Sequence, residues 1–433
     1  MRARLRIGLA LAAAAVLAAG CGDAAAPPEA EALCPESGPT CVRVGVGQPL
    51  FLGTLLLRTD PVGVDAANSI ALAIDYLDGG FDGVPGQLLG HDIALLEEDD
   101  QCSSPGGRTG ALRLAQERSL IAVLGTSCSA AALGAADVVL AQRGILLLSP
   151  SNSAPGLTAV DTHQRTYFRT AFNDLIQASA DADFAYSRMG WRSAAAVHRD
   201  GDAYTTQLSA AFGEAFTALG GEVLGDVGLR DGTTPEAAAA ELARLDPDVV
   251  FLADNRQSNC VATILAIRAQ PALRRTPVVV PDACQSPELR TAAGRDLPEV
   301  YASGPDFSYV ASEPFYREAY LPAYRRLTGG APTGVWHPQA WDAANLLFAA
   351  IRRAAIPTPG GGLVIERERL RRALLTVQGY QGLSGRLTCG TLGDCAESAR
   401  IGVYRYPEWP VNDANAKPIF SQLKTLAQVA NTG

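Results

Sequence analysis

The segment Gly125-Thr-Ser-Cys-Ser129 brings hydroxyl and thiol groups close together, as a nucleophilic site would. It lacks the Gly-x-Ser-x-Gly spacing that exposes a catalytic serine on a strand-to-helix turn, and the chain has no Gly-x-x-x-x-Gly-Lys phosphate loop. The four histidines share no motif with serine, aspartate or clustered cysteine: His91, His163, His198 and His337. We therefore predict a protein that is not an enzyme and has no metal or cofactor.

Cysteine usage is a second chemical signal. The chain has nine cysteines, of which Cys21 follows an export signal, and eight remain. An even number of cysteines in an exported protein implies disulfides, although the connectivity stays open at this level. The simplest choice pairs each cysteine with its neighbour in sequence: Cys34–Cys41, Cys102–Cys128, Cys260–Cys284 and Cys389–Cys395.

The N-terminus has the layout of a signal peptide over residues 1–20. Three arginines precede an apolar run over residues 7–20, and this run is shorter than the roughly 20 residues that a membrane-spanning helix needs. The segment Leu17-Ala-Ala-Gly-Cys21 resembles a bacterial lipobox, which implies cleavage before Cys21 and a lipid on its sulfur. Ordinary cleavage with an unmodified Cys21 is the alternative. Residues 21–41, rich in Ala, Pro and Glu, are expected to form a tether.

Charge and length limit the partners and the architecture. Loss of residues 1–20 removes three arginines and no acid, so the formal charge changes from −9 to −12. An acidic surface of this kind argues against nucleic acid as a partner. The rest of the chain is longer than one typical core supports, which predicts two lobes.

From residue 42 onward, short apolar runs alternate with amphipathic helical stretches, the pattern of an α/β fold with parallel sheets. In the first lobe we expect strands at residues 42–47, 92–97, 121–124 and 145–148, and helices at 66–77, 107–118 and 129–141. In the second we expect helices at 176–189, 205–219, 235–244 and 259–269, and strands at 193–197, 222–227, 248–253 and 277–280. Helices at 313–327, 338–354 and 367–375 and strand-like runs at 385–389 and 400–405 follow.

The loops that follow the strands should carry any function, because ligands of such sheets bind beyond the carboxyl ends of the strands. Most of these loops are rich in Ser, Asp, Asn and Thr, which suits a polar solute but is also ordinary for loops. They are residues 47–63, 125–129, 149–158, 198–204, 253–259 and 281–286.

Several segments together, in this order, resemble the type I periplasmic binding proteins of the leucine/isoleucine/valine-binding branch. They are Val44-Gly-Val-Gly-Gln-Pro49, Asp99-Asp-Gln-Cys102, Gly125-Thr-Ser-Cys-Ser129, Gly144-Ile-Leu-Leu-Leu-Ser-Pro-Ser-Asn-Ser153, Leu157-Thr158, and Phe168-Arg169 with Asp174 and Gln177. The resemblance spans residues 42–410. It implies two Rossmann-like lobes joined by a three-segment hinge, with residues 42–168 plus 304–383 in lobe 1 and 169–303 plus 384–425 in lobe 2. It also supports the Cys102–Cys128 disulfide.

The resemblance implies ligand contacts at six positions. Ser129 or Ala130 would meet a carboxylate, Ser151 and Ser153 an amino-acid head group, Tyr204 would close over the ligand, and Asp282 would pair with an ammonium group. The family usually has a hydroxyl residue where this chain has Ala130, so either of the two neighbours is a candidate for that position. The alternatives are turn serines at 151 and 153, a packing aromatic at 204 and a solvated or helix-capping acid at 282.

Two regions depart from the family pattern, namely a long first loop over residues 50–64 and a polar segment over 253–260. The implied function is the extracytoplasmic solute-binding component of an ABC importer that captures a small polar solute. Its expected partners are the ligand and the permease subunits, with the membrane reached only through the lipid on a monomeric protein. A receptor of the same fold that senses its ligand and signals to a partner is the alternative.

Overall fold

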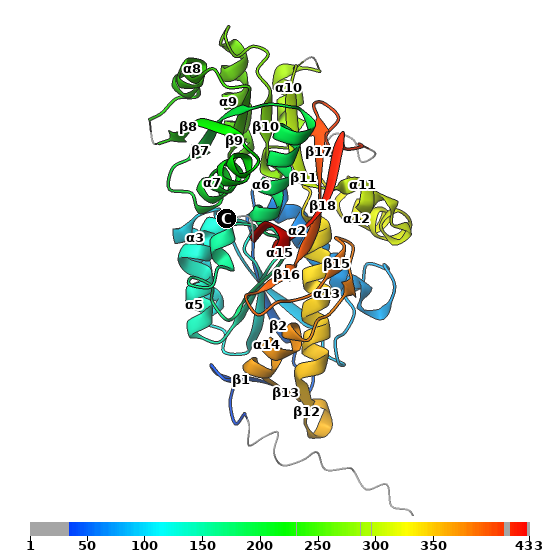
Figure 1. The fold of residues 1–433 in the computed structure, drawn as a ribbon. Helices are drawn as coiled ribbons and strands as arrows, with labels where there is room; N and C mark the ends of the chain where they lie inside the picture. Colours follow the sequence, from blue (N-terminus) through cyan, green and yellow to red (C-terminus); the bar gives the residue numbers. More distant parts are fainter. Residues whose placement is uncertain (1–33, 231, 286, 296, 411–415, 431–433) are drawn as a thin grey trace, which may run out of the picture.

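The computed structural model describes residues 34–430 except 231, 286, 296 and 411–415. The expected signal peptide, Cys21 and the tether up to residue 33 lie outside the described residues. Within the described part of the chain, no helix is long and apolar enough to cross a membrane. The chain folds into two α/β lobes stacked along the long axis of the molecule (Figure 1), which confirms the predicted fold class.

The first lobe is built on a parallel sheet of six strands in the order β16-β6-β5-β4-β2-β3. The strands are β2 (Leu50–Leu55), β3 (Ile93–Glu98), β4 (Leu120–Gly125), β5 (Leu146–Ser149), β6 (Tyr167–Phe172) and β16 (Asp394–Ala396). Strands β4, β5 and β6 are buried throughout, because helices cover both faces of the sheet.

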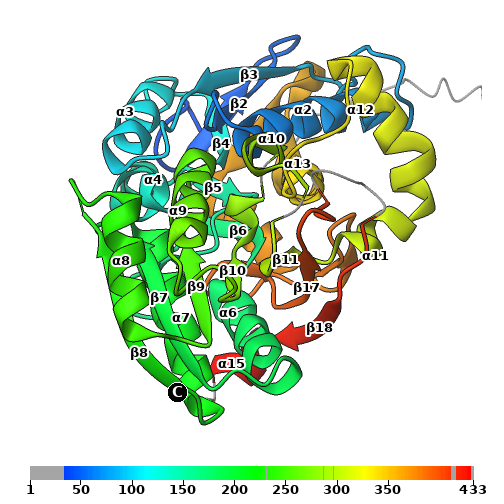
Figure 2. The same cartoon turned by 90° about the horizontal axis from the view of Figure 1, so that it is seen from above.

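The helices divide between the two faces of this sheet, as Figure 2 shows. One apolar cluster joins alternate residues of β5 to α2 (Pro61–Asp75) and α13 (His337–Ala354). The other joins the intervening residues to α3 (Ser104–Leu114) and α5 (Asp137–Gln142), with α4 (Ser129–Ala131) leading into α5. The predicted helices between the strands are thus present.

The second lobe contains seven strands in the order β18-β17-β11-β10-β9-β7-β8. They are β7 (Ser193–Arg199), β8 (Glu222–Leu229), β9 (Val249–Ala253), β10 (Val278–Val280), β11 (Val300–Pro305), β17 (Ser398–Arg405) and β18 (Phe420–Thr425). The first five are parallel, and β17 and β18 pair antiparallel at one edge. One face packs on α6 (Asp174–Ala182) and α7 (Ala203–Ala218), the other on α8 (Pro235–Leu245) and α9 (Gln257–Ala269).

The chain crosses between the sheets three times, after β6, after β11 and between β16 and β17, as the predicted hinge requires. The predicted lobe limits are wrong in detail, because residues 169–172 and 394–396 belong to the first sheet and residues 304–305 to the second. Strand β16 has only three residues and carries a buried charge, so it shows no strand pattern. It is held by its ladder with β6 and by the ion pair of Asp394 with Arg169 at 2.6 Å.

The predicted first strand is also misplaced. Strand β1 (Cys41–Val44) pairs antiparallel with β13 (Leu363–Glu366) in a separate small sheet that includes β12 (Ala355–Pro357). The first strand of the main sheet is β2, so most of the expected long loop over residues 50–64 is strand and helix. The available signal was the mainly apolar run 50–57 between Pro49 and Pro61, which is typical of a buried strand.

The remaining elements lie mainly in the last third of the chain. They are α10 (Pro287–Ala293), α11 (Phe307–Ser312), α12 (Leu321–Thr328), α14 (Arg367–Leu375), β14 (Tyr380–Gln381), β15 (Arg386–Leu387) and α15 (Leu426–Ala430). All four expected disulfides form: Cys34–Cys41, Cys102–Cys128, Cys260–Cys284 and Cys389–Cys395. The second and third fasten loops beyond the carboxyl ends of strands in the first and second lobe, respectively.

Candidate functional site

The carboxyl ends of the two sheets face each other across a cavity of about 640 Å³, part of which opens to solvent. The first lobe contributes Asp60, Pro61, Val62, Ser127, Cys128, Ser129, Ser151, Ser153, Gly334, Val335 and Trp336 to its wall, and the second contributes Tyr204, Asn255, Gln257, Asp282, Ala283 and Gln285. We refer to this space as the interlobe cleft. Its position beyond the strand ends of both lobes is that of a ligand site in this class of fold.

The structure brings five of the six predicted contact residues into the wall of the cleft. Ser129, Ser151, Ser153, Tyr204 and Asp282 line it. Ala130 does not, because it is the second residue of α4 and its side chain projects from a different side of the helix than that of Ser129. At this end of α4, Ser129 is therefore the residue that the cleft presents.

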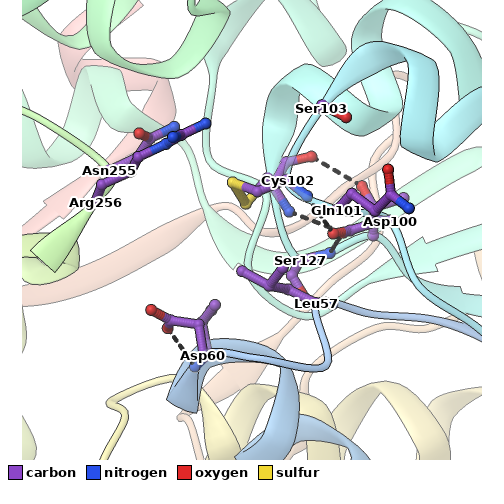
Figure 3. Close-up of a disulfide and its surroundings, with 12 residues drawn as sticks. Leu57, Asp60, Asp100, Gln101, Cys102, Ser103, Ser127, Asn255 and Arg256 are labelled. Carbon is purple, nitrogen blue, oxygen red and sulfur yellow. Dashed lines mark hydrogen bonds between the residues drawn. A yellow bond between two sulfur atoms is a disulfide. The ribbon is translucent and has the colours of Figure 1, made fainter. Parts of the chain in front are cut away.

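The first-lobe loops are organised by Asp100, a residue that the sequence interpretation did not assign to the site. Its carboxylate accepts hydrogen bonds from the backbone N–H groups of Cys102 at 2.8 Å, Ser127 at 2.6 Å and Cys128 at 3.3 Å (Figure 3). Burial raises the pKa of Asp100 to about 6, against the lowering effect of these bonds. Asp100 and the Cys102–Cys128 disulfide together fix the loop that leads to Ser129.

The serines of the first-lobe wall also bond within the lobe. The Ser151 hydroxyl donates to the carbonyl oxygen of Ser127 at 2.9 Å, and the Ser129 hydroxyl oxygen accepts from the N–H of Ala154 at 3.2 Å. The carbonyl of Ser153 accepts from the N–H of Asp174 at 2.9 Å. These residues therefore stabilise turns and also line the cleft, so a role in the turn and a role in ligand contact are compatible.

Trp336 reaches the cleft from a distant part of the sequence. The loop before it is held by Asp65, whose carboxylate accepts from the N–H groups of Thr333, at 2.8 Å, and Gly334, and from the Tyr324 hydroxyl. The Trp336 Nε1–H donates to Asp282 Oδ2 of the second lobe at 2.7 Å. This bond joins the two lobes directly across the cleft.

The second-lobe wall consists largely of hydrogen-bond acceptors. Asp282 follows β10, and burial raises its pKa to about 6 although Trp336 and Gln177 lower it. Its Oδ1 atom is buried and accepts no hydrogen bond from the described residues. The same holds for one side-chain oxygen each of Tyr204, Asn255 and Gln285.

Two further carboxyl groups are buried behind this wall on α6. Neither oxygen of Asp174 accepts a hydrogen bond of ordinary geometry, although the Ser153 hydroxyl is near enough to lower its pKa. Burial and the charge of Asp282 nonetheless raise the pKa of Asp174 to about 8. Asp181 accepts from the Ser303 hydroxyl at 2.9 Å, and burial raises its pKa well above the ordinary value. The carboxyl groups in and behind this wall thus outnumber the basic side chains that could balance their charge.

No group of His, Cys, Asp and Glu among the described residues is arranged to hold a metal ion. A wall of hydroxyls, amides, one indole and two carboxylates offers hydrogen bonds and charge to a polar solute. The described residues of the wall include no histidine, and the Asp282 carboxylate accepts a hydrogen bond from Trp336, so this part of the chain presents no Ser–His–Asp arrangement to the cleft.

The model of a periplasmic binding protein family matches residues 58–394. The chain belongs to this family. Proteins of this family are extracytoplasmic, bind small-molecule ligands and interact with ABC permeases. Among curated protein sequences, none matches the chain.

Solved structures of several family members share the fold. A leucine-binding protein from Thermotoga maritima has 20% identity and a TM-score of 0.70, over 87% of this chain and 98% of that one. A branched-chain amino acid transporter substrate-binding protein from Streptococcus pneumoniae, in complex with isoleucine, has 17% identity and a TM-score of 0.69, over 87% and 99%. A solute-binding protein from R. palustris, in complex with benzoate, has 19% identity and a TM-score of 0.68, over 87% and 96%.

The remaining wall residues differ in whether a sequence pattern could have predicted them. Asn255, Gln257 and Gln285 lie in loops that we expected to carry function, but nothing singled them out. Asp60 precedes Pro61, a typical start of a helix, and its side chain accepts from the N–H of Val62 at 3.1 Å. Trp336 carries no local signal, because only packing of α13 on the first sheet brings it to the cleft.

Proposed function

We propose that this periplasmic binding protein is the solute-binding component of an ABC importer and captures a small polar solute with an amino group in the interlobe cleft. The observation that carries the proposal is the meeting of Asp282 and Trp336 from different lobes at the wall of this cavity. A solute enclosed there contacts both lobes at once. It is transferred intact, since the wall offers recognition groups and no nucleophile with a base.

Closure of the lobes is the event that a permease would recognise. Two hydrogen bonds between the lobes support such closure: Trp336 with Asp282, and the Gly156 N–H of the first lobe with Gln207 Oε1 of the second at 2.7 Å. A solute favours the closed form only to the extent that it binds the closed state more tightly than the open one. Contacts with second-lobe groups such as Tyr204 and Asp282 supply that difference, and Asp282 pairs with the amino group of the solute.

The proposal places the protein outside the cytoplasm as a monomer, anchored through a lipid on Cys21 and otherwise free of the membrane. Its permease partner would receive the closed, loaded form. A sensor of the same fold would close in the same way but bind a signalling protein. Co-purification with a permease rather than with a kinase or chemoreceptor would separate these two roles.

The test is a thermal-shift screen of amino acids, amides, amines and carboxylates, followed by small-angle scattering. A ligand at 100 times its dissociation constant should add about 2.7 kcal/mol to the free energy of unfolding. The same ligand should reduce the radius of gyration of the ligand-free protein as the lobes close. A binder that leaves the dimensions unchanged, or turnover of any candidate, would contradict the proposed function.

A further inference from the structure

The charge of the cleft wall is one-sided. Among its described residues, the wall contains two carboxylates, Asp60 and Asp282, and no lysine, arginine or histidine. Arg256 lies beyond the wall, exposed at the outer mouth, near the Cys102–Cys128 disulfide in Figure 3. A solute that carries only a carboxylate would therefore meet negative charge and no cationic partner in the wall itself.

The second-lobe side of the cleft offers oxygen atoms without donors. Three wall residues have a buried carboxylate or amide oxygen with no hydrogen bond from the described residues, namely Asn255, Asp282 and Gln285, and the Tyr204 hydroxyl, which can accept or donate, is also unpaired. The two amides are held in this orientation, because Asn255 Nδ2 donates to Asp202 at 2.8 Å and Gln285 Nε2 donates to the Ser303 carbonyl at 3.2 Å. A flipped amide would set oxygen against oxygen, so these bonds fix the side-chain oxygen of each amide as the unpaired atom.

Basic side chains around the second-lobe wall already form ion pairs with other carboxylates. Arg169 is fully buried, pairs with Asp394 at 2.6 Å and donates to the carbonyl of Ala154 at 2.9 Å. Arg199 pairs with Asp254 at 3.4 Å. Lys424 pairs with Asp183 at 2.6 Å. Among the described residues, Asp174, Asp181 and Asp282 form no ion pair with a basic side chain: they interact electrostatically with one another, and Arg169 acts on Asp174 only as a nearby charge.

Burying uncompensated carboxylates and unpaired acceptors costs free energy that a matching ligand would recover. The first-lobe side adds apolar surface from Pro61, Val62, Val335 and Trp336. We propose that the ligand is a small aliphatic cation whose positive charges outnumber its negative ones, with N–H groups directed at the second lobe and its carbon chain against the first. This inference rests on the proposed function and specifies its solute class as a diamine or a basic amino-acid derivative.

Proton release should accompany binding of such a ligand. The titratable and charged groups that interact with Asp174 or Asp282 are Asp181, Tyr204 and Arg169, and Asp202 also acts on Tyr204. With the pKa of Asp174 raised to about 8 and that of Asp282 to about 6, Asp174 holds a proton at neutral pH in the ligand-free protein. A bound cation favours the ionised carboxylates, so binding expels protons, and affinity rises as the pH increases from about 6 to 8.

The test is calorimetry with five named probes: 1,4-diaminobutane, lysinamide, leucinamide, leucine and benzoate. We expect the two dications to bind at least tenfold more tightly than leucine, and benzoate to bind more weakly still. At pH 7, enthalpies measured in phosphate and in Tris should differ in the direction of proton release. Tighter binding of leucine or benzoate than of every cation would overturn the inference and leave the proposed function standing. Failure of every probe, with no stabilisation by any solute in the wider screen, would count against both.

Two variants separate charge recognition from folding. Asp282→Asn keeps the shape of the side chain and should weaken diamine binding at least about 30-fold, since the removal of one partner from a buried charge pair is costly. Glu222→Gln removes the same charge from an exposed residue of the second lobe, at the amino end of β8, and should leave the affinity unchanged. Equal melting temperatures of both ligand-free variants exclude misfolding, and equal affinities would refute the role of charge at Asp282.

Discussion

The two walls of the interlobe cleft are built on opposite principles. On the first-lobe side, the side chains of Ser129 and Ser151 in the wall and of Asp100 behind it form hydrogen bonds with the backbone of first-lobe loops. In the second-lobe wall, Tyr204 and Gln285 each keep a buried oxygen unpaired. The polar groups of the first-lobe wall have hydrogen-bond partners without a ligand, whereas several of those in the second-lobe wall would find partners only in a ligand. The first lobe therefore offers a preformed surface, and the second supplies the free energy that favours closure on a solute.

The largest effect should come from Asp100→Ala, which attacks the completed wall. Loss of its carboxylate leaves one buried and two partly buried N–H groups without acceptors, at about 1–3 kcal/mol for a fully buried group. We expect at least about 3 kcal/mol of lost stability in urea unfolding. Asp99→Ala next to it, which removes a single bond to the N–H of Gln101, should cost about 1 kcal/mol. Equal losses would show that the loop does not depend on Asp100.

Next in size are the two disulfides at the cleft, one in each lobe. Cys102–Cys128 and Cys260–Cys284 close loops of similar length, with sequence separations of 26 and 24. In the chain-entropy model, each should contribute about 3 kcal/mol. Paired serine substitutions compared by chemical unfolding will measure both. A much larger loss in the first lobe would mean that its disulfide also holds the ligand-free wall in shape.

Trp336→Phe attacks the bond that joins the walls. The substitution removes the N–H that reaches Asp282, and a hydrogen bond to a charged group contributes about 1.5–3 kcal/mol. We expect about 2 kcal/mol of destabilisation of the closed form. At a ligand concentration that compacts the wild type, scattering should therefore show a larger radius of gyration for the variant than for the wild type. An unchanged radius would mean that other interlobe contacts, such as Gly156 with Gln207, suffice for closure.

Asp174→Asn should remove the cost of burying an ionisable carboxyl behind the second-lobe wall, with an effect on stability that depends on pH. Because its pKa is raised to about 8 when folded and is about 3.9 when unfolded, Asp174 contributes stability at low pH that is lost as the pH rises to about 8. The amide has no such dependence. The ligand-free variant should be more stable than wild type by at least about 1.4 kcal/mol at pH 8, with little difference at pH 4. A parallel pH profile would contradict this.

Local patterns in the sequence predicted the loops that carry the site. Asp282 and Ser151 lie in loops that follow apolar runs with the pattern of parallel strands, and such strands end at the same edge of a sheet, but only the resemblance to the binding-protein family singled out these two residues within their loops. The prediction failed where two neighbouring segments had equally good strand patterns. The apolar runs 41–44 and 50–55 are both strand-like, and only the pairing of β1 with distant β13 separates them. The sequence left Ser129 and Ala130 as alternatives, because one position along a helix turns the side chain in a different direction.

Short stretches of chain determine the periodicity of helices and strands, the predicted export signal and the pairing of neighbouring cysteines. Each of these depends on residues that are close in sequence. The lobe to which residues 394–396 belong was decided by a buried ion pair between Arg169 and Asp394, more than two hundred residues apart. The same is true of the contact between Asp282 and Trp336, and of the acidic cluster formed by α6 with the turn after β10. These features arise because three hinge crossings fold separate segments onto one cleft, a long-range arrangement that no local pattern encodes.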